Sequence, residues 1–217
     1  MAKKRLFVNL EDKSVRMFSN DFLDSFSRVH WTVPLYIYIP VIGFSAYATA
    51  AYTSMVWYMA IVWFLAGIIF WTFAEYVLHR FVFHYHPTTE FGKRIHFMTH
   101  GVHHDYPRDS MRLVMPPSVS VPLAFLFFFG FRFALGAEIG WPFFGGFVIG
   151  YLAYDMIHYA THHANVNWGW FNKLKKHHMD HHYKEPDLGF GVTNTVWDVL
   201  FFTPIDKEEK KKKAVEK

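Results

Sequence analysis

Cysteine is absent from the 217 residues of this chain. Its absence excludes disulfide bonds and metal sites built on thiolates, including Cys-type zinc sites and iron–sulfur clusters. Charged residues are also scarce, at 18%, compared with about 25% in ordinary soluble domains. Apolar residues make up 52% of the chain, aromatic residues make up 21%, and phenylalanine occurs 25 times. This composition is typical of a membrane protein.

Two long stretches of the chain contain almost no charge. No Asp, Glu, Lys or Arg occurs from Trp31 to Ala74, and only Arg132 and Glu138 occur from Leu113 to Tyr154. One crossing of the hydrocarbon core needs roughly 20 apolar residues, so each stretch is long enough for two crossings and a turn. The spans are expected near residues 34–51, 55–73, 118–135 and 142–157.

The basic residues lie almost entirely outside these stretches. Of the 22 Lys and Arg residues, only Arg132 falls within a predicted hairpin. An even number of spans places both termini and the central polar loop on one side, and the positive-inside rule makes that side cytosolic. We therefore expect an all-α integral membrane protein with four transmembrane helices in two hairpins and a cytosolic helical cap. The predicted parts are a cytosolic N-terminal arm (1–30), a membrane domain (31–205) and a charged C-terminal tail (206–217), with shorter helices near 19–29, 168–176 and 195–202.

Histidine is concentrated in four short clusters on the predicted cytosolic side. They contain ten of the 15 histidines, and two clusters have the spacing i, i+3, i+4. On a helix this spacing places three imidazoles on one face, where we expect them to reach a single point. Imidazole is the commonest metal ligand among side chains, and ten of them suffice for two ions. The clusters are His79 and His84; His100, His103 and His104; His158 and His162; and His178, His181 and His182.

No carboxylate occupies a ligand position in these clusters. This separates them from the Glu-x-x-His sites of di-iron bundles, and the lack of His-Glu-x-x-His argues against a zincin-type protease. A nitrogen-rich site without thiolates suits Fe, Zn, Cu or Ni, and the spacing does not choose among them. A metal transporter or sensor is the alternative from another functional class. It would predict ionisable residues near the centres of the spans, and the predicted spans have none there.

Several segments resemble the fatty acid hydroxylase superfamily of membrane di-iron enzymes, which includes sterol desaturases and carotenoid hydroxylases. The similarity extends from Thr72 to Thr203 and is strongest to the fatty acid 2-hydroxylases that act on sphingolipid acyl chains. Histidine clusters alone indicate only the superfamily, whereas the runs Arg-Leu-Val-Met-Pro-Pro and Leu-Gly-Phe-Gly-Val-Thr indicate this branch. The segments are residues 75–84, 96–104, 112–117, 150–163, 174–184 and 188–193.

The resemblance implies a non-haem di-iron monooxygenase that hydroxylates C2 of long-chain fatty acyl groups, free or in ceramide-like lipids. A sterol or carotenoid hydroxylase or desaturase is the alternative within the superfamily. The implied cofactors are two iron ions, with zinc as a substitute in an isolated sample, and O2 is the co-substrate.

Only residues 1–30 precede the first span, and the His-Pro-Gly-Gly motif of a cytochrome b5 domain is absent. Electrons are therefore expected from a separate protein, either cytochrome b5-like or a ferredoxin with its reductase. The other expected partner is a membrane lipid, with no nucleic acid, at the bacterial inner membrane or the endoplasmic reticulum.

The site residues follow by position from the same resemblance. Its metal ligands fall on His79, His84, His100, His103, His104, His158, His162, His178, His181 and His182. Behind them we expect Glu75, Asp155, Asp180 and His96, with the acids accepting the second ring N–H of a ligand. Arg112 is a candidate for contact with the substrate head group, and Asp109 is its alternative partner. His30 and His86 match no cluster and are expected on the surface, while His163 and His177 are left unassigned.

Overall fold

The computed structural model describes residues 6–205, and helices are its only regular secondary structure in that range. The predicted tail at 206–217 lies outside the described residues. The chain divides into two compact units. Unit 1 comprises Met1–Val15, Glu75–Ser110 and Ile157–Lys217, and unit 2 comprises Arg16–Ala74 and Met111–Met156.

The helices are α1 (Asp21–Ser25), α2 (Val33–Tyr52), α3 (Trp57–Val77), η1 (Leu78–Phe83), α4 (Glu90–His96), η2 (Phe97–Gly101), α5 (Val102–Asp105), α6 (Pro117–His163), α7 (Gly169–Tyr183) and α8 (Val196–Leu200), with η marking π-helix.

Three helical stretches among the described residues are long and apolar enough to cross a membrane. They are α2, α3 together with η1, and α6. The first two contain the predicted spans at 34–51 and 55–73, apart from the first residues of the second. The third covers both of the remaining predicted spans, so the number of crossings depends on the course of α6.

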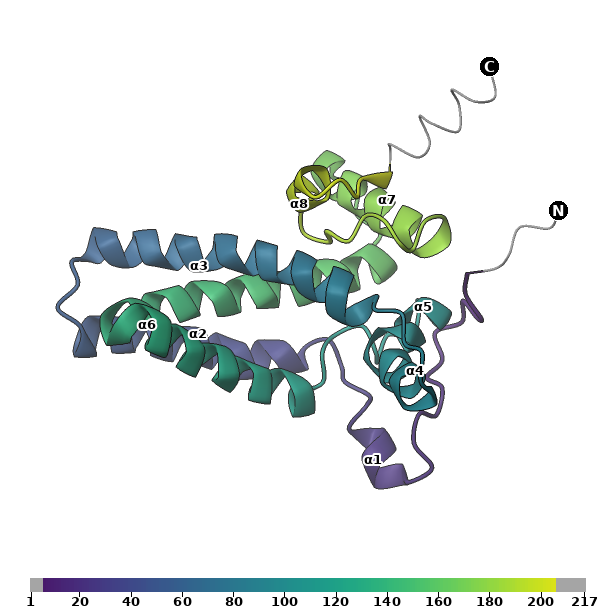
Figure 1. The fold of residues 1–217 in the computed structure, drawn as a ribbon. Coiled ribbons are helices and arrows are strands. Elements are labelled where there is room, and N and C mark those ends of the chain that lie inside the picture. Colours follow the sequence, from purple (N-terminus) through teal and green to yellow (C-terminus); the bar gives the residue numbers. More distant parts are fainter. Residues whose placement is uncertain (1–5, 206–217) are drawn as a thin grey trace, which may run out of the picture. The chain divides into compact units, whose positions relative to one another are not determined.

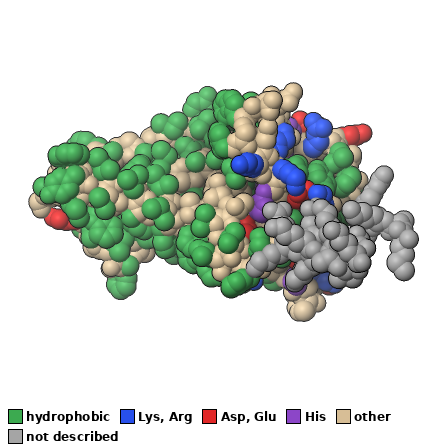
Figure 2. All heavy atoms as spheres, turned by 90° about the horizontal axis from the view of Figure 1, so that it is seen from above, with side chains coloured by type: hydrophobic (Ala, Val, Ile, Leu, Met, Phe, Trp, Pro, Cys, Tyr) green, Lys and Arg blue, Asp and Glu red, His purple; other side chains and the backbone are tan. Residues whose placement is uncertain are grey.

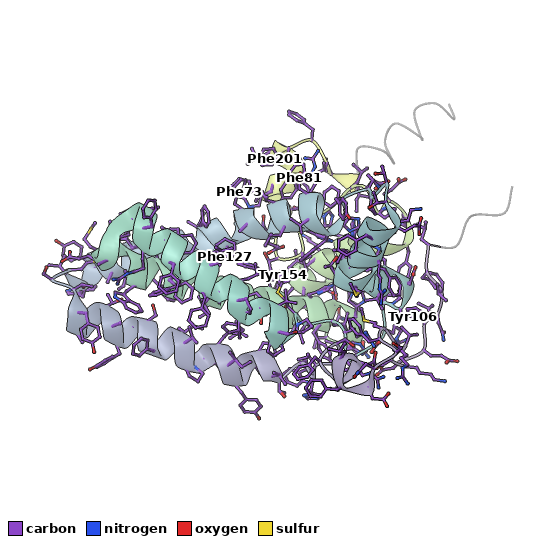
Figure 3. All side chains as sticks on the ribbon, turned by 60° about the horizontal axis from the view of Figure 1, so that its bottom comes forward. Phe73, Phe81, Tyr106, Phe127, Tyr154 and Phe201 are labelled. Carbon is purple, nitrogen blue, oxygen red and sulfur yellow. The ribbon has the colours of Figure 1, made fainter. Side chains whose placement is uncertain are left out.

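The chain reverses direction within α6 at Gly136. This residue has φ 81° and ψ 173°, a backbone conformation that is essentially restricted to glycine. Ring contacts join the two sides of this point: Phe127 lies 4.7 Å from Phe147, and Phe131 lies 4.9 Å from Phe143. The residue numbers of both pairs have the same sum, so the two halves of α6 run antiparallel, as Figure 1 shows. Phe127 is labelled on the first half in Figure 3.

Within unit 2, α3 approaches the second half of α6 closely enough to require glycine. A Cβ atom on Gly146 would lie 1.8 Å from the carbonyl oxygen of Phe64, and one on Gly67 would lie 2.1 Å from that of Phe143. Small residues that let backbones approach are typical of helix packing in membranes. Apolar side chains cover the visible face of the long helices (Figure 2). Unit 2 therefore has the packing and the surface of a membrane bundle.

The connection between α2 and α3 lies beside the reversal at Gly136. The hydroxyl of Ser54 donates a hydrogen bond to the Glu138 carboxylate at 2.8 Å. The Arg132 guanidinium lies over the ring of Trp141, 5.1 Å from its centroid. Both charged residues of the second apolar stretch thus lie near the turn.

Candidate metal centre

The pair His79 and His84 is carried by a π-helical turn. η1 follows α3 directly, and the backbone N–H of His84 donates to the carbonyl oxygen of His79 at 3.1 Å. A π-helix bonds residues five apart, so both rings of an i, i+5 pair lie on one side of the turn. The same geometry recurs at η2, which contains His100. The unusual spacing of the first cluster is explained by this local structure.

The ten clustered histidines come together in unit 1 as two groups of five. Within each group, one ring nitrogen per residue lies within 4.8 Å of all the others. We name the groups site A and site B. Site A consists of His79, His84, His100, His104 and His181, and site B consists of His103, His158, His162, His178 and His182.

Each three-histidine cluster contributes to both sites. His100 and His104 belong to site A, whereas His103 belongs to site B. In the last cluster His178 and His182 belong to site B, and His181 belongs to site A. Consecutive residues of an α-helix point about 100° apart, so the i+3 and i+4 rings diverge. The expectation that all three rings of a cluster reach one point is therefore wrong.

The distances within each site match those of ligands around one ion. The Nε2 atoms of His79 and His100 are 3.1 Å apart in site A, and those of His103 and His158 are 2.9 Å apart in site B. With a metal–nitrogen bond of about 2.1 Å, two ligands at right angles lie about 3.0 Å apart. Five imidazoles would also leave one position of an octahedral ion open to another ligand. The side chains present thus fit a nitrogen-bound metal ion at each site.

Burial keeps these imidazoles in the form that binds metal. Desolvation, followed by the charges of neighbouring histidines, lowers the pKa of His100 and His103 well below its ordinary value. The pKa values of His104, His178, His181 and His182 are lowered for the same reasons. At neutral pH these rings are uncharged, which leaves a nitrogen lone pair for coordination.

A glycine-rich loop at residues 188–193 holds two ligands of site A. The Nδ1–H of His79 donates to the carbonyl oxygen of Phe190 at 2.5 Å, and that of His181 donates to the carbonyl of Leu188 at 2.7 Å. A proton held on Nδ1 leaves Nε2 unprotonated and directed at the metal position. The loop therefore sets both the tautomer and the orientation of these rings.

Glu75 supports this loop. Its carboxylate accepts hydrogen bonds from the backbone N–H groups of Val192 and Thr193 at 2.7 and 2.9 Å, and from the Thr193 hydroxyl at 2.5 Å. The prediction placed Glu75 directly behind a ligand ring, as the acceptor of its N–H. In the structure that acceptor is a loop carbonyl for His79, and the hydrogen bonds of Glu75 run to the loop instead.

Asp198 supports the same loop and was missed by the sequence analysis. Its fully buried carboxylate accepts hydrogen bonds from the N–H groups of Phe190 and Gly191 at 2.8 and 3.0 Å. It also lies 3.2 Å from Nε2 of His177, which the sequence left unassigned. The available signal was an acidic residue within the otherwise apolar helix that follows the loop.

The remaining predicted residues have other partners. Asp180 is bound by Lys176 and Lys184 at 2.5 and 2.8 Å. Asp155 belongs to unit 2, where it interacts with the Tyr151 side chain and the Met115 backbone. Their predicted positions behind the ligands stay predictions. His96 is half-buried and hydrogen-bonds the Phe83 backbone, and His30 and His86 are exposed as expected.

Arg112 is buried in unit 2, and its guanidinium lies 3.8 Å from the carboxylate of Asp24. Asp24 also binds Arg28. A hydrogen bond donated by the backbone of Met17 is the largest influence that lowers the pKa of Asp24, to about 2. Arg112 therefore has an internal carboxylate partner, and its contact with substrate stays a prediction.

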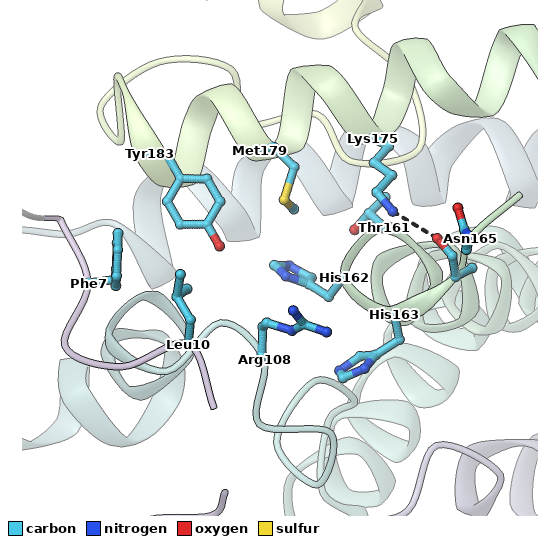
Figure 4. A pocket seen from close by; sticks show the side chains of 11 residues that line it. Phe7, Leu10, Arg108, Thr161, His162, His163, Asn165, Lys175, Met179 and Tyr183 are labelled. Atoms are coloured by element: carbon cyan, nitrogen blue, oxygen red, sulfur yellow. Dashed lines mark hydrogen bonds between the residues drawn. The ribbon is translucent and has the colours of Figure 1, made fainter. Parts of the chain in front are cut away.

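One pocket of unit 1 reaches site B. It has a volume of about 620 Å³, and His162 forms part of its wall. Arg108 and Tyr183 point toward His162 across the pocket, and Lys175 donates a hydrogen bond to the carbonyl oxygen of Ala164 at 2.8 Å (Figure 4). His162 thus belongs both to site B and to a surface accessible from outside the site.

Comparison with known proteins decides the family. A family model described as fatty acid hydroxylase matches residues 64–203, a range that contains every clustered histidine. The chain belongs to the fatty acid hydroxylase family. The resemblance indicated by the sequence motifs is confirmed, and the two histidine sites lie within the family's defining segment.

Individual relatives agree with this assignment. This hydroxylase family member is 38% identical to dihydroceramide fatty acyl 2-hydroxylase FAH1 of Arabidopsis thaliana, over 90% of this chain and 83% of that protein. It is 34% identical to the fatty acid 2-hydroxylase of Mus musculus, over 90% of this chain and 58% of the relative. A solved structure described as full-length scs7p, with only the hydroxylase domain visible, has a TM-score of 0.81 and 36% identity, covering 87% of this chain and 71% of that one. The chain therefore spans most of the plant relative and little more than half of the mouse one.

Proposed function

We propose that this chain is a membrane monooxygenase that hydroxylates C2 of long-chain fatty acyl groups, free or amide-linked in ceramide-like lipids. The observation that carries the proposal is the presence of two five-nitrogen histidine sites in a member of the fatty acid hydroxylase family. The names of the relatives specify fatty acyl 2-hydroxylation and ceramides. They favour an acyl substrate over the sterol or carotenoid alternative.

The overall reaction inserts one oxygen atom of O2 into a C–H bond and releases the other as water, using two electrons and two protons. Insertion of an oxygen atom from O2 is a redox reaction that acid–base groups alone do not perform, so iron bound by the nitrogens of sites A and B would supply this chemistry. The electrons would come from a cytochrome b5-like protein or from a ferredoxin with its reductase.

Aromatic side chains shield one side of site A. The ring of Phe83 stacks on His100 with centroids 5.2 Å apart, and Phe190 lies 5.5 Å from His84. Such walls exclude water from the reacting groups, which strengthens electrostatic interactions and limits side reactions. They also offer an apolar surface to an acyl chain. The protein's own contribution is thus to orient the ligands and to keep the site dry.

The membrane topology is part of the proposal. A straight helix as long as the 47 residues of α6 would extend about 70 Å, more than twice the hydrocarbon thickness of about 30 Å. The reversal at Gly136 divides it into two segments of suitable length, which supports four crossings. The distribution of Lys and Arg supports a cytosolic position for the histidine sites, at the bacterial inner membrane or the endoplasmic reticulum.

The substrate can be tested in a lipid-producing host that also expresses a compatible reductase. Mass spectrometry of hydrolysed lipids should detect new 2-hydroxy acids, mainly from the ceramide fraction. A sample with bound iron and an active electron donor but no 2-hydroxy acids would refute the acyl substrate. Hydroxylated sterols or carotenoids in the same extract would support the alternative.

The metal ligands can be tested in the same assay. Nε2 of His100 lies 3.1 Å from Nε2 of both His79 and His104, so His100→Ala removes the central ligand of site A. We expect the metal of site A to be lost and product formation to fall by more than about 100-fold, the upper end of losses caused by outer partners of ligands. The exposed residue His30 supplies the control, His30→Ala, which should be fully active. Full activity of His100→Ala would show that the ligand assignment is wrong.

A further inference from the structure

We infer that the two sites are unequal and that site A binds its ion more tightly than site B, with Asp198 as a positioning residue for site A. The inference rests on the proposed dimetal centre and adds an order of affinity to it. It derives from the second ring nitrogen of each ligand. When Nε2 binds the metal, Nδ1 carries the proton and needs a hydrogen-bond acceptor elsewhere in the protein.

Two histidines of site A already have the tautomer and the ring orientation that metal binding requires. A histidine that coordinates through Nε2 must carry its proton on Nδ1. For His79 and His181 this proton is already held by the loop carbonyls of Phe190 and Leu188. These two rings need neither a change of tautomer nor a rotation when the ion binds, and such outer partners typically raise metal affinity 10- to 100-fold.

Site B contains ligands without this preparation. The Nδ1 atoms of His103, His178 and His182 are buried and have no hydrogen-bond partner within the described range. As in site A, the Nε2 atoms face one another, with His178 2.9 Å from His162 and 3.1 Å from His182, so the difference between the sites lies in the partners of Nδ1. Such rings can hydrogen-bond through Nε2–H until an ion displaces that proton. Coordination then places N–H groups on Nδ1 atoms that have no acceptor, which is unfavourable in a buried site.

Burial acts on the two sites in the opposite sense. All five ligands of site B are buried, whereas His84 and His104 of site A are partly exposed. Burial slows the exchange of an ion, but burying a charge also costs desolvation free energy. Ligand preparation lowers the cost of ordering the site when the ion binds, so we take it to determine the order of affinity.

Asp198 acts on site A through the loop backbone. Its carboxylate fixes the N–H of Phe190, and the carbonyl of that same residue accepts the proton of His79. The loop backbone is closely packed: Gly189 has φ 72°, and a Cβ atom on Gly191 would lie 1.9 Å from the carbonyl oxygen of Asn194. Removing the negative charge of Asp198 should therefore loosen the carbonyl that orients His79.

The order of affinity can be measured by titrating metal-free protein in detergent with Zn²⁺ against a chromophoric chelator, with metal content determined by mass spectrometry. We expect two ions per chain whose dissociation constants differ by at least tenfold. A saturating content below two ions would contradict the dimetal centre itself. Two ions of equal affinity would overturn the inference and leave the dimetal centre standing.

Two ligand variants identify which site is tighter. His178→Ala should remove the weaker ion and leave one ion per chain at the original high affinity. His181→Ala should remove the tighter ion and leave the weaker one. The opposite pattern would show that site B is the tighter site, and it would overturn the inference.

The positioning role is tested with Asp198→Asn, which should weaken the tighter ion 10- to 100-fold and leave the weaker ion unchanged. The matched control is Asp187→Asn, an exposed acid beside the same loop, which should change neither constant. Equal weakening of both ions by Asp198→Asn would reduce Asp198 to a general structural role and overturn the assignment.

A milder variant tests the same role if the Asp198→Asn protein does not fold. The Thr203 hydroxyl donates to Asp198 at 2.9 Å and lies 2.9 Å from the Tyr76 hydroxyl. Thr203→Val removes one hydrogen bond to the Asp198 carboxylate together with this contact to Tyr76. It should weaken the tighter ion selectively but by a smaller factor. An unchanged affinity of the tighter ion in a folded Thr203→Val protein would count against the positioning role.

Discussion

Glu75 shows how one buried acid can influence a candidate metal site without contacting any of its histidines. Its carboxylate accepts three hydrogen bonds from Val192 and Thr193. These residues end the loop whose carbonyls hold the rings of His79 and His181. The acid stabilises a segment of backbone, and the backbone orients the ligands.

Truncation of this acid should destabilise the protein. Glu75→Ala leaves two backbone N–H groups and one hydroxyl without an acceptor, and each buried unsatisfied group costs about 1–3 kcal/mol. We expect a clearly lower midpoint of thermal unfolding in detergent. Glu90→Ala is the control, because Glu90 is exposed and its ion pair is with the exposed Lys93, a contact worth about 0–1 kcal/mol. Equal midpoints for the two variants would show that the hydrogen bonds of Glu75 contribute little.

The identities of the clustered histidines could be predicted from spacing, but their division between two sites could not. His103 and His104 carry the same imidazole, and only the rotation between positions i+3 and i+4 separates them. The partners of the ligands were harder still to predict. Backbone carbonyls of Leu188 and Phe190 carry no residue-type signal, and acids near a ligand in sequence, such as Asp180, have lysine partners.

At the scale of secondary-structure elements, π-helical turns place two of the histidine clusters. Both η1 and η2 lie directly after α-helices and contain or precede ligands. A π-turn widens the helix and interrupts its regular hydrogen bonding, and such turns are frequent at functional sites. Nothing in residue propensity distinguishes Leu78–Phe83 from an α-helical continuation, so this feature required the structure.

The reversal within α6 depends on one glycine. A Cβ atom on Gly136 would meet no other atom within 4 Å, so Gly136→Ala tests the backbone conformation alone. Such strained conformations cost of order 1–3 kcal/mol for other residues, and we expect a corresponding loss of stability. Gly130→Ala lies in the same helix, also without close contacts, and should be neutral or slightly stabilising. If both variants behaved alike, the turn would not require glycine.

The long elements were predicted well because their signal is simple. A run without charge determines where a membrane helix can lie, and α2 begins one residue before the predicted span and ends one residue after it. The short elements were less well predicted. α1 covers only Asp21–Ser25, since tertiary contacts rather than propensity determine the ends of so short a helix.

At the scale of the whole molecule, the proposed orientation in the membrane can be tested directly because the chain has no native cysteine. Ser54 lies in the connection between α2 and α3, and Thr88 lies between η1 and α4. Both are exposed. In intact bacterial spheroplasts, a membrane-impermeant maleimide should label Ser54→Cys. Thr88→Cys should react only after permeabilisation. Labelling of both positions in intact cells would contradict the proposed four-span topology.

The metal sites would also act on the polypeptide as cross-links. His79 and His181 come from distant parts of the sequence and share one site, so a bound ion closes a loop of about 100 residues, which for a disulfide is worth about 4.7 kcal/mol of chain entropy. In a polypeptide without cysteine, metal-bound imidazoles can provide such cross-links. Unlike covalent cross-links, they are lost when the ion dissociates, so removal of the metal would leave a less stable protein that proteases attack more readily.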